Sequence, residues 1–573
     1  MWYRSNRDLV RSLILPASGY LILSPGFIRR ECAARRDEPL FSYPNNRIKR
    51  RIIMKKFLAL LLALIMALSV ASIASAEDEV DTRPRTIVTT DLECDDIDSL
   101  LHLLLYANDI DIAAIIVTSS THHWTGDGEH TMSEVIDSFQ KGGDLTIWRA
   151  MEVNWVYDTI RNEYAAVYPN LVKHDARYPS PGELVEKTKI GNVQFEGDYR
   201  FDTEGSDFIK GILLDDDMRP LYVQAWGGAN SLARALKSIE EEYKDTDDWD
   251  AVYGKVCQKT TLISWGNQDK SYADYIAVAW PDMGRKYCVT GGIGYNTSIN
   301  CTIPYREYFK PAWLTENIKF NHGPLMGKYL LFGDGTYYEG ENPDSQFGFM
   351  STLARDDCWL KRLNGLVDRY EFISEGDSPC WMYLIPVGLR GLENSEYGSW
   401  GGRITNEYGG RAISEYDPTT GRLSSGYSVH RWFPAFMNDW AARADWCVTD
   451  FDGANHQPMV CTSTEDVTVP RGTTVELNGF AEDPDGDGLT FNWWVYKDAS
   501  VYSGANLAYL DVWAHGVAST SFTVPADAEE GDYFNLVLEV TDNGSPALTR
   551  YAQVIITTDA VPEGGDNGGS SGG

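Results

Sequence analysis

Five carboxylates lie within eight consecutive residues of this chain. The stretch TTDLECDDIDSLL carries Asp91, Glu93, Asp95, Asp96 and Asp98. A helix N-terminus favours one or two acids because of its dipole and its free amides. Four acids between positions 91 and 96 repel one another unless a cation or protonation relieves the repulsion. Because an oxygen-rich cluster without thiols suits Ca²⁺ or Mg²⁺, the sequence predicts a divalent-cation site here.

The elements around this loop are those of a β-α-β unit. The β-branched segment TIVTT, residues 86–90, predicts a buried strand, and residues 96–108 place apolar side chains at helical spacing. Residues 112–117, IAAIIV, predict a second strand. The acids therefore follow a strand and open a helix, which is where ligands bind in open parallel sheets.

The same alternation recurs further along the chain. LYVQAW, residues 221–226, is followed by a helical pattern over 230–243, and TTLISW, residues 260–265, by another over 271–280. Such alternation predicts an α/β fold with a mostly parallel sheet covered by helices. We expect this domain to span residues 77–455.

Residues 456–560 have a different pattern. Short alternating strands such as TTVELNGF, TFNWWVY and NLVLEVTD predict an all-β, immunoglobulin-like sandwich. Trp493 and Trp494 must point to opposite faces of their strand, so one is expected in the core. The other either packs against the large domain or is exposed to stack on sugar rings. DPDGDG, residues 483–488, resembles the start of an EF-hand loop, but Trp494 stands where the closing Glu is required, so we expect a turn.

Both ends of the chain are expected to lie outside the working fold. Residues 54–76, MKKFLALLLALIMALSVASIASA, have the basic start, apolar run and small-residue end of a secretory signal peptide. The true start is then Met54, and residues 1–53 are a mis-assigned extension. The rival interpretation is a membrane anchor with a basic cytoplasmic arm. Residues 561–573 predict a flexible Gly/Ser tail.

Charge and cysteine content narrow the class of function. The net charge of −33 disfavours nucleic acid and anionic lipid as partners, and it suits divalent cations, neutral sugars and an extracellular location. Nine cysteines are present without CxxC or zinc spacing, so no zinc site is expected. Export permits disulfides. Cys447 and Cys461 are the nearest candidate pair, although sequence cannot assign pairs.

The acidic loop resembles a known signature. TTDLECDD is similar to the motif of the calcium-dependent nucleoside hydrolases, and the longer TTDLECDDIDSLLHLLLYANDIDI is closer still to a bacterial secreted family described as cellulose-binding. WGGR (400–403), AARADWCV (441–448) and ANHQP (454–458) also resemble that family, over roughly residues 85–560. The resemblance implies a nucleoside-hydrolase-like domain followed by a β-sandwich domain.

The resemblance also implies roles for individual residues. Asp91 and Asp96 would be calcium ligands, with Asp95 as the general base. The Gly-rich turn in WGGANSLARAL nominates Asn230 as a ligand through its main-chain oxygen, and EGDSP nominates Asp377. Each of the last two has a plainer alternative, because the glycines suit a tight turn and an Asp before Ser-Pro suits a helix N-cap.

The chain departs from the nucleoside hydrolases in two places. Their loop after the second strand carries a Gly-Asn that holds the sugar, whereas this chain has TSSTHHW, residues 118–124. Their late Asp follows a His, whereas here Gly376 precedes Asp377. We assign the substrate-binding role to other polar and aromatic side chains nearby. These are Glu93, His122, Trp124 and Glu375.

Two functions remain open from the sequence. The first is a secreted, calcium-dependent hydrolase of a glycosidic bond in a nucleoside or a glycan such as a plant cell-wall polysaccharide. The second is a cellulose- or polysaccharide-binding protein that uses the same site without cleavage. Retention of Asp91, Asp95 and Asp96 favours the hydrolase, since a binding site needs ligands but no base. A haloacid-dehalogenase-type phosphatase needs an acid two residues after its nucleophilic Asp, and that acid must be followed by Thr or Val. Here the acid is Glu93 and the next residue is Cys94, so this class of enzyme is excluded.

Overall fold

The computed structural model describes residues 81–560 apart from 138, 140–141, 150–151, 289–291, 296, 336–367, 408 and 506–512. The expected extension, signal peptide and tail lie outside the described residues. The described residues from Thr82 onward belong to one compact unit. Within the described part of the chain, no helix has the length and apolar character needed to cross a membrane.

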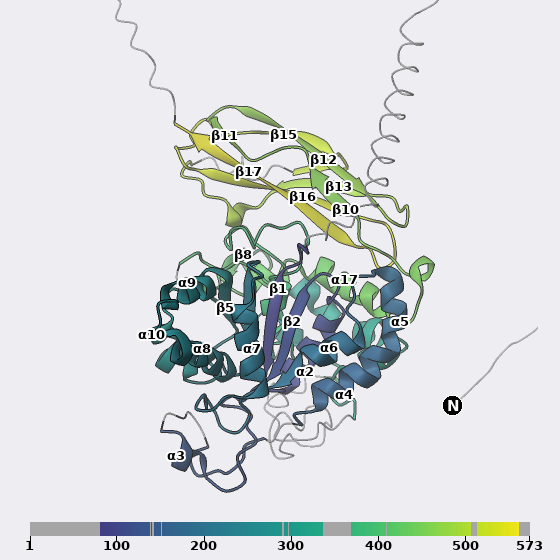
Figure 1. Cartoon of the computed structure of the whole chain (residues 1–573). Coiled ribbons are helices and arrows are strands. Elements are labelled where there is room, and N and C mark those ends of the chain that lie inside the picture. The colour runs from purple at the N-terminus through teal and green to yellow at the C-terminus, as the bar shows by residue number, and fades with distance from the viewer. Residues whose placement is uncertain are drawn as a thin grey trace, which may run out of the picture. The chain divides into compact units, whose positions relative to one another are not determined.

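A seven-stranded, all-parallel sheet organises the larger part of this unit (Figure 1). Its strand order is β3-β2-β1-β4-β5-β6-β7, so the direction of winding reverses beside β1. All residues of β1 and β4 are buried, as expected for central parallel strands. The strands are β1 (Arg85–Thr90), β2 (Asp111–Val117), β3 (Thr188–Ile190), β4 (Leu221–Ala225), β5 (Thr260–Ser264), β6 (Gly284–Tyr287) and β7 (Gly410–Arg411).

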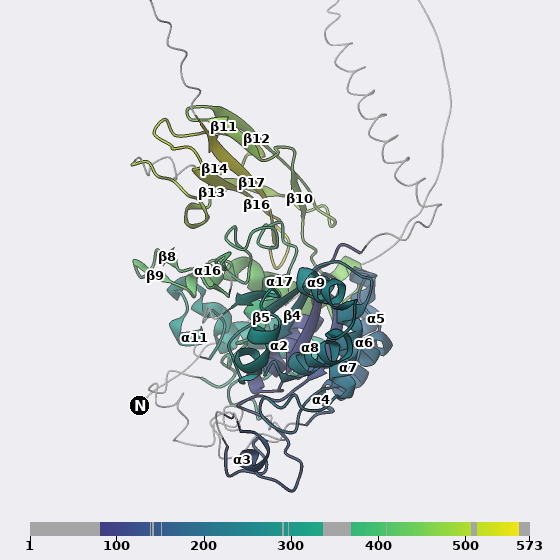
Figure 2. The ribbon, with the colours of Figure 1, turned by 60° about the vertical axis from the view of Figure 1, so that its left-hand side comes forward.

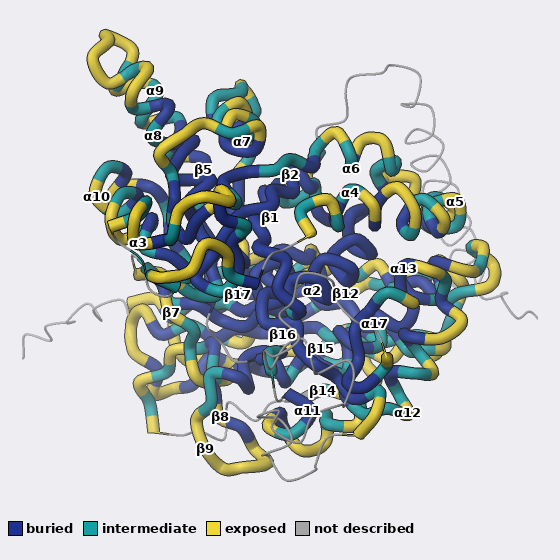
Figure 3. The backbone as a smooth tube through the Cα atoms, turned by 90° about the horizontal axis from the view of Figure 1, so that it is seen from below, coloured by how far each residue is buried: buried dark blue, intermediate teal, exposed yellow. Residues whose placement is uncertain are grey.

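Helices cover both faces of the sheet, and each layer has its own core. One core joins alternate residues of β1 and β2 to α2 (Cys94–Leu104), α5 (Ala165–His174), α6 (Pro181–Lys187) and α17 (Phe433–Trp446). The other core joins the opposite strand faces to α7 (Glu204–Leu214), α8 (Asn230–Tyr243) and α9 (Trp249–Lys259). In Figure 3 the tube of β1, β2 and α2 is mostly in the colour of buried residues, and exposed residues lie on outer turns and outer helices.

Shorter helical segments fill the connections. They are α3 (Met132–Val135), α4 (Trp155–Thr159), η2 (Ile160–Tyr164), η3 (Tyr272–Ile276), α10 (Ala277–Ala279), α11 (Thr297–Asn300), η4 (Ile303–Phe309), α12 (Pro311–Leu314), η5 (Thr315–Lys319), α13 (Gly323–Gly327), α15 (Ser378–Met382), α16 (Tyr427–His430), η6 (Phe451–Gly453) and η7 (Lys497–Ala499). A small hairpin of β8 (Glu415–Asp417) and β9 (Arg422–Ser424) lies beside α16 (Figure 2). The expected α/β fold with a parallel sheet is confirmed.

The C-terminal region consists of two β-sheets around a separate core. One sheet has the order β10-β12-β15 and the other β11-β17-β16-β13-β14. Trp493 is buried in this core, whereas Trp494 packs against the core of the α/β region, as the alternation requires. The immunoglobulin-like detail stays a prediction. The strands are β10 (Met459–Thr462), β11 (Val467–Pro470), β12 (Thr474–Glu482), β13 (Thr490–Val495), β14 (Trp513–His515), β15 (Ser519–Thr523), β16 (Tyr533–Thr541) and β17 (Thr549–Asp559).

A buried ion network joins the β-sandwich to the α/β region. Asp439 of α17 accepts from Arg443 at 2.8 Å and from Arg550 of β17 at 2.7 Å. Arg443 also pairs with Asp109, which follows α2. Burial raises the pKa of Asp439, but the two guanidinium groups outweigh it and lower the pKa to about 2. The expected domain boundary, at residues 455 and 456, falls between η6 and β10.

The disulfide suggested for Cys447 and Cys461 is not formed. Both cysteines are free, as are the other cysteines of the described residues. Cys447 is buried at the end of α17, where its thiol lies 3.6 Å from the Arg443 carbonyl oxygen. Cys461 is exposed on β10. The short distance in sequence between Cys447 and Cys461 did not predict a disulfide, because the chain passes from the buried core to the surface between them.

Candidate metal and catalytic site

The acidic loop lies at the point where the strand order reverses. β1 pairs with β2 on one side and with β4 on the other, so the loops that follow these strands meet at the carboxyl edge of the sheet. A Cβ added to Gly227, in the turn after β4, would lie 2.8 Å from the Asp91 Cβ. This contact between two loops explains the glycine, because any side chain at 227 would push the acidic loop away.

Three carboxylates converge beside this contact. Asp95, Asp96 and Asp377 each offer an oxygen, and these oxygens lie within 4.8 Å of one another. Asp96 accepts from the Thr90 hydroxyl at 2.6 Å and from the Asp91 amide at 3.2 Å. Burial and the neighbouring carboxylates raise the pKa of Asp96 and of Asp377 well above the usual range. The group therefore carries a repulsion that a bound cation would relieve.

Asp377 stands at the N-cap position of α15 without acting as a cap. Its side chain makes no capping hydrogen bond, and its buried Oδ1 has no hydrogen-bond partner. Buried polar atoms are almost always satisfied, so an orphaned carboxylate oxygen beside two other carboxylates calls for a ligand. This geometry favours the metal interpretation of Asp377 over the plain N-cap.

Asp91 belongs to a second group, with Glu93 and His123. One atom from each lies within 4.8 Å of the others, and all three side chains are buried. The Ser120 hydroxyl donates to Asp91, and the His123 ring lies 3.6 Å from the same carboxylate. Burial raises the pKa of Asp91, but the contacts with His123 and Ser120 outweigh it and lower the pKa. Asp91 is thus the carboxylate most fully supported by the protein itself.

Tyr295 bridges the two groups. Its hydroxyl lies 3.1 Å from Glu93 Oε1 and 3.3 Å from Asp95 Oδ1. Burial and the nearby negative charges raise the pKa of Asp95 to about 6 and that of Glu93 to about 8. Asp95 is also 3.5 Å from the Ser374 hydroxyl. These contacts hold Asp95 at the edge of the three-carboxylate group, in a position suited to a base.

Gly376 is required by the position of Asp95. A Cβ added to Gly376 would lie 2.5 Å from Asp95 Oδ2. The His that precedes the late Asp in the resembling enzymes therefore does not fit here without displacing Asp95. The departure seen in the sequence has a local steric reason.

Asn230 opens α8, and its side chain is fully engaged. Its Oδ1 accepts from the Thr118 hydroxyl at 2.6 Å, and its Nδ2 donates to the Ser119 hydroxyl and to the Asn192 carbonyl. Asn230 thereby ties the turn after β4 to the loop after β2. Its role as a main-chain metal ligand stays a prediction.

The side chains assigned to substrate lie in different surroundings. Glu375 is fully buried and accepts from Tyr329 at 2.5 Å and from Ser378 at 2.6 Å, while His102 lies 3.0 Å away. It therefore supports the loop that carries Asp377 rather than facing a ligand. Trp124 packs with Met132 and Phe195 in a small buried cluster of its own. In contrast, Glu93 and the half-buried His122 do lie beside Asp91.

Two neighbours of the acids carried little signal in the sequence. His123 was one of two adjacent histidines, and only the fold shows which ring lies against Asp91. Tyr295 follows β6, whose GRKY sequence has no apolar alternation. If residues 284–287 had been predicted as a strand, Tyr295 would have been expected in the loop at the carboxyl edge of the sheet, beside the other loops of the site.

A doubly wound parallel sheet with buried carboxylates at its switch point defines an α/β protein with a candidate metal-dependent site. The profile of the family described as "Cellulose-binding Sde182, nucleoside hydrolase-like domain" matches residues 85–404, more than half of the chain. The chain belongs to this family. A second profile, "Cellulose-binding protein Sde0182, C-terminal domain", matches residues 474–558.

Solved structures agree with this fold. A nucleoside hydrolase-related protein from Saccharophagus degradans, described as associated with carbohydrate metabolism, is 24% identical, with a TM-score of 0.57 over 83% of this chain and 100% of that one. The plant nucleoside hydrolase PpNRh1 is 13% identical over 53% of this chain and 80% of its own, with a TM-score of 0.24, too low to support an argument. A comparison with curated protein sequences gives no match.

Proposed function

We propose that this protein is a secreted, calcium-dependent hydrolase of a glycosidic bond, acting on a carbohydrate or nucleoside. The observation that carries the proposal is the group formed by the half-buried Asp95 and the buried Asp96 and Asp377 at the carboxyl edge of the sheet, with the Asp377 Oδ1 lacking a hydrogen-bond partner. Membership of a family described as cellulose-binding and nucleoside hydrolase-like supports a carbohydrate ligand and an extracellular location.

The residues present fit a hard divalent cation. All three side chains of the group supply carboxylate oxygens, the ligands that Ca²⁺ prefers. Asp96 and Asp377 would hold the ion, with Asp91 adjoining them. When bound, calcium would supply Lewis-acid polarisation of a water or sugar hydroxyl oxygen. The cation would also offset the repulsion that raises the pKa of Asp96 and of Asp377.

The protein's own groups have distinct tasks in this proposal. Asp95 takes a proton from a water molecule whose oxygen bonds to the anomeric carbon as the bond to the leaving group breaks. The leaving group departs with the electron pair of that bond and takes up a proton from solvent. The Tyr295 hydroxyl lies between Asp95 and Glu93 and donates its single proton to one of these carboxylates at a time. Glu93 and His122 would contact substrate hydroxyls beside Asp91.

A second function is favoured by the family's description. In a non-catalytic cellulose- or polysaccharide-binding protein, the same carboxylates would hold calcium and sugar without cleavage. The two functions differ only in the task of Asp95, because a binding site needs ligands but no base.

The test is hydrolysis by the purified full chain with and without calcium, on a panel of nucleosides and soluble glycans. Asp95→Asn is the diagnostic variant, and Asp98→Asn, which changes a buried acid outside the three-carboxylate group, is its matched control. We expect hydrolysis that requires calcium, and a loss of roughly 10²- to 10⁴-fold in Asp95→Asn alone, as for removal of a general base. Calcium binding with sugar retained by both proteins but no turnover would establish the non-catalytic function instead.

A further inference from the structure

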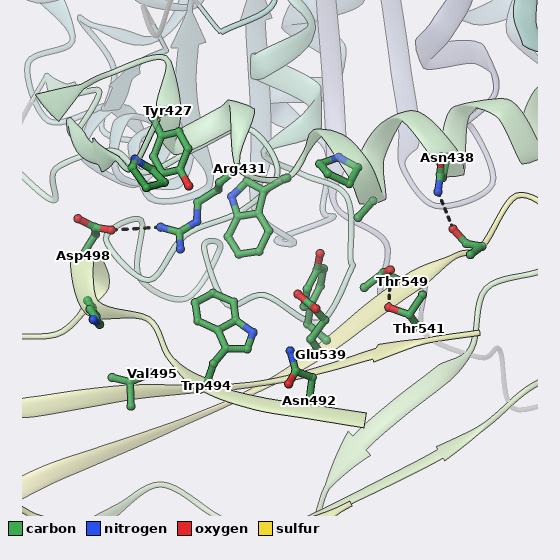
Figure 4. A pocket seen from close by; sticks show the side chains of 17 residues that line it. Tyr427, Arg431, Asn438, Asn492, Trp494, Val495, Asp498, Glu539, Thr541 and Thr549 are labelled. Carbon is green, nitrogen blue, oxygen red and sulfur yellow. Dashed lines mark hydrogen bonds and ion pairs between the residues drawn. The ribbon is translucent and has the colours of Figure 1, made fainter. Parts of the chain in front are cut away.

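A cavity of about 820 Å³ lies away from the acidic loop, where the β-sandwich meets α16 and α17 (Figure 4). Its volume is within the range of roughly 300–1,000 Å³ seen for small-molecule sites. One wall is the face of three neighbouring strands, and the other is a helical surface. None of the residues assigned to the acidic loop lines this cavity.

In the strand wall, side chains of three neighbouring strands stand in rows of paired residues. Asn492 pairs with Glu539, and Glu539 with Tyr551, across β13, β16 and β17. Thr541 and Thr549 pair in the next row, and their hydroxyls lie 2.9 Å apart. Because alternate residues of a strand share a face, these side chains and Trp494 all project to the same side. A rigid sheet face of this kind presents its side chains with little freedom to rearrange.

Aromatic rings dominate the cavity. Trp494 projects from β13 into the space and remains half-buried (Figure 4). Trp432 and Tyr551, which also line the cavity, are almost fully buried. The Trp432 ring lies 6.2 Å from that of Trp494 and 5.3 Å from that of Tyr551, measured between centroids. The buried rings fix the direction of Trp494, whose exposed part offers an apolar, flat surface with a polar edge.

Polar groups surround the rings, and their charges cancel. Glu539 and Asn492 are hydrogen-bonded to each other, and burial raises the pKa of Glu539. Arg431 is already paired with Glu415 at 2.7 Å and with Asp498 at 3.2 Å. The charged side chains that line the cavity are Arg431, Lys497, Asp498 and Glu539, two of each sign. Such a lining offers no excess charge to a phosphate or a polyanion.

A hydroxyl-rich neutral ligand satisfies all of these features. A pyranose ring has an apolar face of C–H groups and a rim of hydroxyls that both donate and accept. Trp494 matches the face, whereas the Glu539–Asn492 pair and the threonine row match the rim. We propose that this cavity binds a short segment of a neutral glycan, with Trp494 as the stacking platform and Glu539 and Asn492 as its hydrogen-bonding partners.

This site is independent of the proposed hydrolysis. The acidic loop is built from buried carboxylates of the parallel sheet, whereas the cavity needs no cation and uses side chains of the sandwich and of α16 and α17. Glycan binding in the cavity is therefore expected to persist when divalent cations are removed.

The test is calorimetric titration of the full chain, in EDTA, with cellohexaose, xylohexaose and mannohexaose, and with trigalacturonate as the anionic comparison. We expect a neutral hexasaccharide to bind and trigalacturonate not to bind. Trp494→Ala should weaken binding about tenfold or more, as for loss of a central aromatic contact. Trp494→Phe should restore part of the affinity, and Glu539→Gln should weaken it severalfold. Phe480→Ala, which removes an exposed ring on the other sheet, is the matched control and should leave affinity unchanged.

Because Trp494 also packs against the α/β core, thermal melting must show that each variant is folded. If Trp494→Ala does not fold, the test rests on Glu539→Gln and Thr541→Val. Binding of no neutral hexasaccharide would overturn the proposal, as would equal affinity in the wild type, Glu539→Gln and Thr541→Val. Binding that appears only when calcium is present, and that the cavity variants do not change, would place the glycan at the acidic loop and refute a separate site.

Discussion

The acidic loop and the aromatic cavity offer opposite chemistry. The loop concentrates buried carboxylates whose mutual repulsion is unrelieved by the protein, whereas the cavity balances its charges and offers rings and hydroxyls. In the acidic loop, repulsion between carboxylates favours the binding of a cation or of a positively charged reacting group. In the cavity, the charges of the side chains balance one another, which suits a neutral ligand. The difference suggests one place for chemistry and another for holding a polymer.

The two sites are nevertheless connected by α16. Its neighbour Arg431 lines the cavity, and the His430 ring lies 2.9 Å from the Gly292 carbonyl oxygen, three residues before Tyr295. Gly292 itself packs against Val429, since a Cβ there would lie 2.8 Å from the Val429 Cβ. Experiments that change one site can therefore measure how far the other responds.

The largest effect on calcium binding is expected from Asp377→Asn. Removing one of three repelling acids should raise the melting temperature without calcium, because the Asp377 side chain makes no capping bond that would be lost. The same change should weaken calcium binding by roughly 100-fold and abolish the thermal stabilisation that bound calcium provides. Calorimetry and thermal melting of the variant check both effects.

Asp98→Asn is the control for this experiment, since Asp98 is buried nearby but outside the group. A lower melting temperature in Asp377→Asn, with calcium affinity unchanged, would contradict the metal interpretation of the acidic loop. Hexasaccharide affinity in EDTA should be the same in both variants.

Asp439→Ala should have the largest effect on stability. It leaves Arg443 and Arg550 buried without their shared carboxylate, which costs about 3–5 kcal/mol of unfolding free energy for a broken buried pair. Because α17 and β17 both line the cavity, hexasaccharide binding should fall while calcium binding persists. Denaturant unfolding and the two titrations measure these outcomes.

Lys244→Ala removes an exposed ion pair with Glu240 and should change neither stability nor binding measurably. If Asp439→Ala weakened calcium and hexasaccharide binding equally, the two sites would not be separable in the way proposed.

His430→Gln should give a smaller, pH-dependent effect. Burial lowers the pKa of His430 to about 4, so the unfolded chain takes up the proton first as the pH falls. The wild type should therefore lose about 2 kcal/mol of stability between pH 7 and pH 5 through this group, while the contribution is fully present above pH 6.5. Denaturant midpoints at several pH values should show a flatter profile in His430→Gln. Identical profiles would mean that the pKa of His430 is the same in the folded and the unfolded chain.

Tyr295→Phe should have the smallest effect of the series. Loss of the hydroxyl between Glu93 and Asp95 should lower kcat about tenfold, as expected for a hydrogen bond to a charged group. Hexasaccharide affinity should not change. Steady-state kinetics, on whichever substrate the panel identifies, measure kcat, and calorimetric titration measures hexasaccharide affinity. An unchanged kcat would mean that Tyr295 has no role in hydrolysis.

The sequence predicted the central strands well because their apolar pattern is strong. β1, β2, β4, β5 and α8 lie within a residue or so of the expected ranges, whereas α2 begins two residues early, at Cys94, and ends four residues early, at Leu104. β6 was missed because its sequence, GRKY, has a glycine and two successive basic residues in place of an apolar pattern, at the side of the sheet away from its centre. Apolar periodicity detects burial on both faces and fails where a strand is only half-covered.

The candidate site was predicted in part. Asp95 and Asp96 are neighbours in sequence and Asp377 was found by its motif, so their convergence with one another followed from the resemblance. Glu375 lies only two residues from Asp377, yet it faces His102 and Tyr329, and no pattern in sequence tells which of two close acids points inward. The cavity could not be predicted, because its lining comes from three strands and a helical segment far apart in the chain.

The carboxylate of Asp439, shared by two arginines from different regions, has a consequence for how the two regions evolve. Arg550 comes from β17, so a gene truncated before that strand would encode an α17 whose buried acid has lost one of its two partners. Recombination that exchanged the sandwich for an unrelated module would meet the same penalty. We therefore expect the two regions to be transmitted as a unit, with Asp439, Arg443 and Arg550 changing together when they change at all.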